Sequence, residues 1–127
     1  MSHYDVWIDL ECAINGARQV VCTVFAKREF PIRPTVGERV TFWSAQGAPT
    51  TFDVVTVSGP RSHHYVDVEI DDIAHHFHPS AEGILASVCV RCTPVVAVTN
   101  EDARRIVAFM VEQHGFELDP YGPNALG

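Results

Sequence analysis

The sequence predicts an α+β fold. A mainly antiparallel sheet of six to seven short strands curls toward a small barrel, and one amphipathic helix follows at about residues 100–114. Three observations predict this fold. Apolar and polar residues alternate with a period of two through most of the chain, Gly and Pro separate the alternating segments at regular spacing, and the period changes to 3.6 after Thr99.

Seven segments have the alternation that is typical of strands. The first, residues 4–12, places Val6, Ile8 and Leu10 on one face and acidic residues on the other. The others are residues 18–27, 38–44, 50–58, 63–70, 83–91 and 95–98. Between the fifth and sixth segments, residues 71–77 predict a short helical turn that Pro79 ends.

The first two segments predict a hairpin, because Asn15–Gly16 is typical of a two-residue type I′ turn. In that register Cys12 faces Gln19 and Cys22 faces Asp9. A disulfide between Cys12 and Cys22 would need another register, so we expect both to be buried free thiols.

The helix has signals at both ends. Thr99 or Asn100 provides the N-cap, and acidic residues in the first turn favour the positive end of the helix dipole. Gly115 is typical of a C-terminal stop. The stripe expected to be buried is Ala103, Ile106, Val107, Met110 and Val111. Residues 1–115 therefore predict a single α+β domain, and residues 116–127 a C-terminal tail that either docks or frays.

Composition excludes several classes of function. The 127 residues suffice for one domain, and the net charge of −7 makes nucleic-acid binding an unfavourable expectation. No apolar run is long enough to cross a bilayer, and the first ten residues lack the features of a signal peptide. We therefore expect a cytoplasmic protein with reduced thiols and no membrane partner.

No phosphate-binding or dinucleotide motif is present, so the sequence predicts no cofactor.

Cys89 and Cys92 form a C-x-x-C pair, a spacing found in zinc and redox sites. The surrounding alternation predicts a strand, on which residues three apart point to opposite faces. We therefore do not expect the two sulfurs to act together.

Histidine is the one unusual feature, because five of the seven lie between residues 63 and 78. His75 and His78 would share one face of a helical turn, although Pro79 disfavours that geometry. The candidate metal ligands are His64, His75, His78 and Asp71. A metal- or histidine-dependent enzyme built on residues 63–78 is the alternative hypothesis, and a polar loop without a bound metal is the favoured one.

Aromatic residues on the predicted strands suggest a second kind of site, an apolar pocket for a small molecule. The candidate ligand-binding residues are Trp7, Phe42, Trp43 and Tyr65. The favoured hypothesis is a small soluble binding or interaction module. We also expect a homodimer, since a monomer exposing Trp7, Val24 and Phe109 together would carry a large apolar patch.

Overall fold

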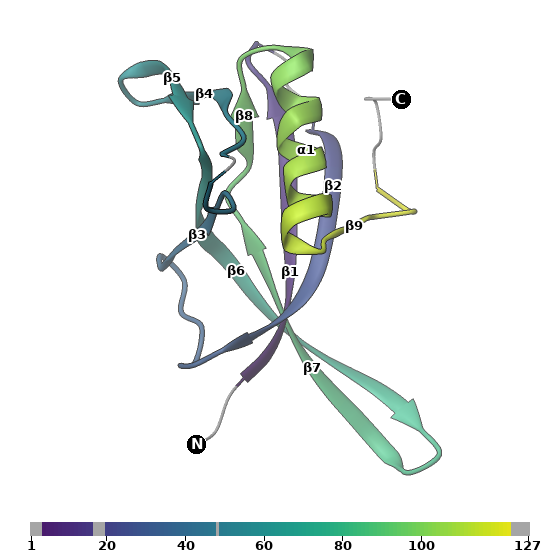
Figure 1. Ribbon diagram of the computed structural model, residues 1–127. Helices are drawn as coiled ribbons and strands as arrows, with labels where there is room; N and C mark the ends of the chain where they lie inside the picture. Colours follow the sequence, from purple (N-terminus) through teal and green to yellow (C-terminus); the bar gives the residue numbers. More distant parts are fainter. Residues whose placement is uncertain (1–3, 17–19, 48, 123–127) are drawn as a thin grey trace.

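The computed structural model describes residues 4–16, 20–47 and 49–122, which form one large sheet with a single helix against it (Figure 1). The strands are β1 (Tyr4–Ile14), β2 (Val20–Phe30), β3 (Arg39–Trp43), β4 (Phe52–Thr56), β5 (Gly59–His63), β6 (Tyr65–Ser80), β7 (Gly83–Cys92), β8 (Val95–Ala97) and β9 (Glu117–Leu118), and the helix is α1 (Asn100–His114). The α+β class and the C-terminal helix are confirmed.

Strand β1 lies at the centre of the sheet. It pairs with β2 antiparallel along one edge, and along the other it pairs in parallel with β7 and then with β8. The strand order is β3-β6-β7-β1-β8-β4-β5, with β2 and β9 off this path. The sheet of the described residues is therefore mixed, nine-stranded and open. The predicted barrel is wrong, and so is the strand number of six to seven.

The core lies between α1 and the face of the sheet that the alternation of residues 4–12 predicts. Val6, Ile8 and Leu10 are almost fully buried, as are Ile106 and Phe109 of the helix. Burial of this apolar area is the main term that holds helix and sheet together. Phe109 lies off the centre of the expected stripe, but its ring contacts that of Phe52 on β4.

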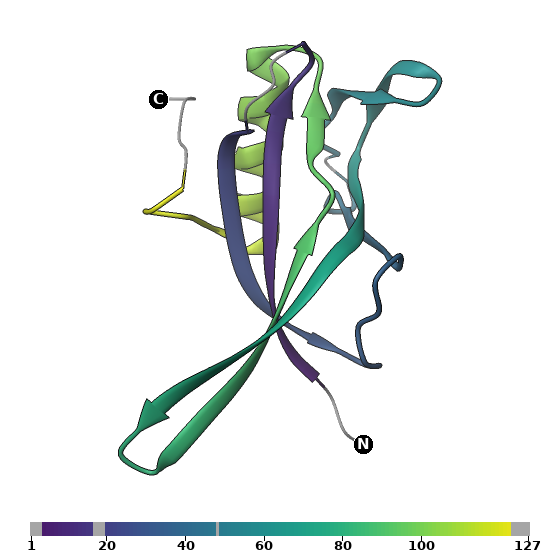
Figure 2. The same cartoon turned by 180° about the vertical axis from the view of Figure 1, so that it is seen from behind.

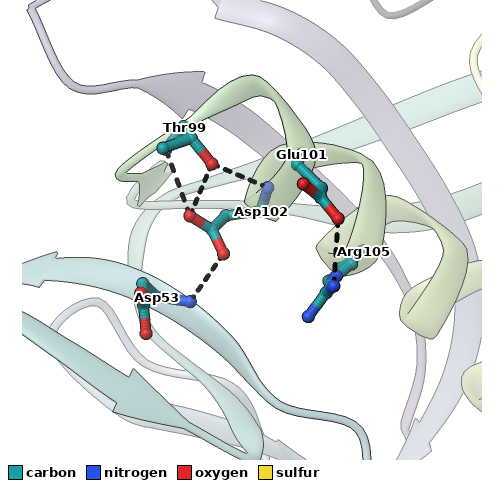
Figure 3. A network of polar contacts seen from close by, with 5 residues as sticks. All are labelled: Asp53, Thr99, Glu101, Asp102 and Arg105. Carbon is teal, nitrogen blue, oxygen red and sulfur yellow. Dashed lines mark hydrogen bonds and ion pairs between the residues drawn. The ribbon is translucent and has the colours of Figure 1, made fainter.

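Both predicted helix ends are present. The Thr99 hydroxyl accepts from the Asp102 backbone N–H, and the Asp102 carboxylate accepts in return from the Thr99 backbone N–H (Figure 3). This is a capping box. The same carboxylate also accepts from the Asp53 backbone N–H, which ties the helix to β4. Gly115 ends the helix with a φ of 68°, a conformation that favours glycine.

The register of the first hairpin differs from the prediction. Cys12 lies opposite Cys22, and a register shift separates Cys12 from Ala13. A two-residue turn at Asn15–Gly16 would have put Gln19 opposite Cys12; residues 17–19, where that turn would close, lie outside the described residues. The observed register differs from the predicted one by an odd number of residues. The side chains of β2 that face the core are therefore Cys22, Val24 and Ala26, and not the residues between them that the predicted register places there.

The helical turn predicted for residues 71–77 is wrong, because these residues continue β6 as far as Ser80. Strands β6 and β7 pair from Ile70–Cys92 to Ser80–Gly83, and their distal part projects away from the helix-covered body (Figures 1 and 2). Tertiary pairing with β7 outweighs a weak local preference for helix. We call residues 73–88 the arm.

The predicted tail begins in the core. Phe116 is buried against Phe42, and β9 pairs with β2, whereas residues 123–127 lie outside the described residues. The apolar patch on which the dimer expectation rested is not on the surface, because Val24 and Phe109 are both buried. No helix in the described part of the chain has the length and apolarity that crossing a bilayer requires.

Candidate functional site

An aromatic cluster lies where β3 pairs with β6. Trp43 is opposite Tyr65, and their ring centres are 4.8 Å apart. The His64 ring lies 5.7 Å from that of Trp43, and the His63 ring stacks on Tyr65 at 4.5 Å. Trp43 remains 57% exposed. The cluster therefore presents a large flat indole to solvent with aromatic support behind it.

A surface recess of about 610 Å³ adjoins this cluster. The C-terminal end of α1 positions its rim: Gln113 Oε1 accepts from the Ala45 backbone N–H, and His114 Nε2 donates to the Trp43 carbonyl at 2.8 Å. Its lining residues are Trp43, Ser44, Ala45, Gln46, Gly47, Pro49, Thr51 and His64. None of these is Asp, Glu, Lys or Arg, so the recess fits a neutral ligand better than an ionic one.

A polar group follows the cluster along the same face of β3 and β6. Asp67 accepts from Arg39 Nε at 3.2 Å and from Arg39 Nη2 at 2.6 Å, and Thr41 Oγ1 donates to it at 2.9 Å. The Arg39 hydrogen bond is the main cause that holds the pKa of Asp67 below its usual range. These hydrogen bonds stabilise the ionised carboxylate, which favours a role in joining β3 to β6 over a role in proton transfer.

The four predicted ligand-binding residues lie in three places. Trp43 and Tyr65 lie together in the cluster described above. Phe42 points to the opposite side of β3 and is buried against Phe116 and His114. Trp7 contacts Phe25 on the first hairpin, at a distance from the cluster along the sheet. Ligand binding at Trp43 and Tyr65 stays a prediction.

The arm is a second candidate surface, and the register of β6 with β7 defines its two faces. One face, which we call the apolar face, carries Ile73, His75, Phe77, Pro79, Ile84, Ala86 and Val88. The other, which we call the histidine face, carries Ala74, His76, His78, Leu85, Ser87 and Cys89. Residues 75–86 are all exposed. The arm was not predicted from the sequence, although the shortage of charged residues between residues 73 and 88 is a signal for it.

The change from helical turn to strand also changes which histidines are neighbours. On a strand, residues two apart share a face and residues three apart do not. His75 is therefore on the apolar face and His78 on the histidine face, with His76 beside it. The pairing of His75 with His78 on a helical turn, which Pro79 disfavours, is therefore absent, because the segment is a strand.

The candidate metal ligands of the alternative hypothesis lie apart in the structure. His64 is at the aromatic cluster, Asp71 pairs with Arg91 at 3.4 Å, and His75 and His78 lie on opposite faces of the arm. Within residues 4–16, 20–47 and 49–122, no group of three or more His, Cys, Asp or Glu side chains could hold a metal ion.

The four cysteines are free thiols. Burial raises the pKa of Cys12 to about 12 and that of Cys92 to about 12. Cys89 is partly exposed, and its Sγ donates to Asp9 Oδ2 at 3.6 Å. Burial, with the nearby Asp9 charge, raises the Cys89 pKa to about 11. None of these three is poised as a thiolate nucleophile at neutral pH.

Comparisons with known proteins do not indicate a function for these surfaces. No family model, no curated protein and no solved structure matches the chain. The geometry of the aromatic cluster and of the arm is therefore the basis for a functional proposal.

Proposed function

We propose that this chain is a protein-interaction module that self-associates as a homodimer through its arm. The observation that carries the proposal is the exposed apolar face of the arm. Phe77 is 68% exposed and Ile84 is 72% exposed, and both lie on this face. Full burial of one such side chain contributes about 1.5–3 kcal/mol, so covering the face gives a strong drive for association.

The arm also lacks the structural support of the rest of the sheet. Strand β3 pairs with β6 only as far as Glu69, and β1 pairs with β7 only from Val88 onward. Beyond these points the arm is a two-stranded ribbon whose outer edges pair with no other described strand. Such ribbons are only marginally stable in water. A partner that covers one face would supply the missing layer.

The composition of the arm is that of an interface. Glu82 is the only Asp, Glu, Lys or Arg residue between residues 73 and 88, whereas charged residues make up 20% of the chain. Cores of protein interfaces are depleted in charge in the same way. Exposed strand edges that must remain unpaired usually carry charged side chains, especially lysine, and the arm has no lysine.

A second copy of the chain is the partner that this surface fits. The apolar face continues into a groove of about 760 Å³ at the base of the arm, lined by Tyr4, Pro34, Val36, Ile73 and Val88 together with Arg33, Thr35 and His75. One molecule thus offers both an apolar projection and a largely apolar groove on the same surface. A two-fold contact could place Phe77 of each arm in the groove of the other copy, which is the self-complementarity that a closed dimer needs.

Light scattering coupled to size exclusion tests the proposal at micromolar concentration. We expect a mass of twice the 14.0 kDa chain, and the double variant Phe77→Ser/Ile84→Ser should elute as a monomer. Leu85→Ser is the matched control, since Leu85 is 61% exposed on the arm but lies on the histidine face. A wild-type protein that stays monomeric, or a control that dissociates equally, would overturn the proposal.

The recess beside Trp43 supports a second candidate function, the binding of a neutral ligand with a flat apolar face. Trp43 offers an exposed indole for stacking, and the lining carries no charged side chain. The neutral fluorescent probe Nile red tests this surface. We expect Trp43→Ala to abolish an emission increase that Trp7→Ala preserves, because Trp7 lies elsewhere on the sheet. Equal loss in both variants would contradict specific binding at the recess.

A further inference from the structure

Two imidazoles lie side by side on the histidine face of the arm. His76 and His78 are two residues apart on β6, so both side chains leave the strand on the same side. Their ring centres are 6.3 Å apart, and the ring planes differ by 13°. Their cross-strand partners are Ser87 and Leu85, neither of which carries a charge.

This spacing is compatible with one metal ion bound by both rings. Bonds between zinc and imidazole nitrogen are about 2.0–2.1 Å, so each ring centre lies about 3.2 Å from a shared ion, and at a tetrahedral angle two ring centres lie about 5.2 Å apart. The observed separation of 6.3 Å is longer than this by about 1 Å. Because both side chains are exposed, rotation about their side-chain bonds can bring the nitrogens onto one ion without moving the backbone.

We propose that His76 and His78 form a two-imidazole binding site for a divalent transition-metal ion such as Zn²⁺. Imidazole ligands suit zinc, copper and nickel, whereas magnesium and calcium prefer carboxylate and carbonyl oxygen. The surrounding recess is lined by Trp7, Lys27, Ala86 and Cys89 besides the residues already named, and it has no carboxylate. This inference holds whether or not the arm mediates self-association.

The site has two protein ligands, and the other positions of the ion remain open. Cys89 lines the same recess, but its Sγ donates to Asp9, and no third ligand completes a preformed group in the described part of the chain. Water or a donor from another molecule would therefore fill the remaining positions. Metal ions compete with protons for imidazole nitrogen, so binding should weaken in acid. The Lys27 cation lines the same recess, and its charge also weakens the binding of a metal cation.

Isothermal titration of untagged full-length protein with Zn²⁺ tests the site. His76→Ala and His78→Ala should each weaken binding roughly tenfold or more, because each removes the advantage of a second tethered ligand. His75→Ala is the matched control, as it removes a neighbouring imidazole from the opposite face and should leave the affinity unchanged. The double variant His76→Ala/His78→Ala measures background binding by the remaining histidines.

Nuclear magnetic resonance of the wild-type protein gives a second readout that does not depend on the folding of any variant. Zn²⁺ should shift the imidazole signals of His76 and His78 and leave those of His75 in place. Equal affinity of the double variant and the wild type would overturn the proposal. So would a loss in His75→Ala as large as that in His76→Ala, or a zinc-induced shift confined to histidines outside the arm.

Discussion

Removal of the Asp102 carboxylate should destabilise the protein more than any other change at the helix N-terminus. The group accepts hydrogen bonds from the Thr99 backbone N–H at 3.2 Å, the Thr99 hydroxyl at 2.7 Å and the Asp53 backbone N–H at 3.0 Å (Figure 3). It therefore closes the capping box and also joins α1 to β4. Asp102→Ala breaks both links at once.

The expected loss of unfolding free energy is about 2–3 kcal/mol. Loss of half the capping box and of its charge at the helix N-terminus costs about 1–1.5 kcal/mol. A hydrogen bond to a charged acceptor contributes about 1.5–3 kcal/mol, and the Asp53 bond belongs near the lower end because Asp53 is exposed and water can replace its partner. Asp102→Asn keeps one acceptor oxygen and should lose about half as much.

Urea unfolding of Asp102→Ala and Glu101→Ala, each against the wild type, measures the difference. Glu101 is the matched control, since it is an acidic residue in the same turn whose carboxylate forms an exposed ion pair with Arg105 at 3.0 Å (Figure 3). Its loss should cost about 0.3–0.5 kcal/mol. Two variants that agree within about 0.5 kcal/mol would contradict both the capping role of Asp102 and its link to Asp53.

The pH dependence of the same variant gives an independent check. Burial acts to raise the Asp102 pKa, but the hydrogen bonds from Asp53 and Thr99 outweigh it, so the net pKa is lowered. A lowered folded-state pKa means that the contribution is present above the unfolded value of about 3.9 and is lost as the pH falls through the folded value. The wild type and Asp102→Ala should therefore differ at pH 7 and converge well below pH 4. A constant difference down to pH 2 would contradict the role of the charge.

Two further predictions concern the core and the thiols. Phe109→Ala should lower the unfolding free energy by about 3–5 kcal/mol in urea titrations, because the ring is 2% exposed and contacts Phe52; a loss below about 1 kcal/mol would contradict this account of the core. An alkylating reagent at pH 8 should modify native Cys89 slowly and Cys12 and Cys92 more slowly still, since their pKa values are about 11, 12 and 12. Mass spectrometry checks the order, and rapid labelling of native Cys12 would be the contrary result.

The features that the sequence predicts correctly are those that neighbouring residues determine. The capped helix from about residue 100 to 114 follows from Thr99 and the residues of the next four turns, and Gly115 ends it as expected. The buried side of β1 follows from alternation over residues 4–12 alone. In both cases the periodic pattern and the burial of one face express the same local geometry.

The features that the sequence does not predict depend on distant residues. The parallel pairing of β1 with β7 joins residues such as Val6 and Val88, and no local pattern encodes the direction of such a pair. The extension of β6 through His76 arises from pairing with β7, while its own composition also suits a turn. The candidate sites follow this division. Trp43 and Tyr65 come together because β3 lies beside β6, and His76 joins His78 because the segment is extended.

One strand carries all the surfaces proposed here, and this arrangement has a consequence for how they could work together. β6 contributes Tyr65 to the aromatic cluster at one end and His76, Phe77 and His78 to the arm at the other. At roughly 3.3 Å per residue, a strand of 16 residues spans about 50 Å, so an occupied arm leaves the recess beside Trp43 open.

Within the arm, the apolar and histidine faces point in opposite directions. A second copy covering Phe77 would therefore leave His76 and His78 accessible to a metal ion, and zinc should bind monomer and dimer with similar affinity. A zinc affinity that rises steeply with protein concentration would instead mean that imidazoles of two copies share the ion.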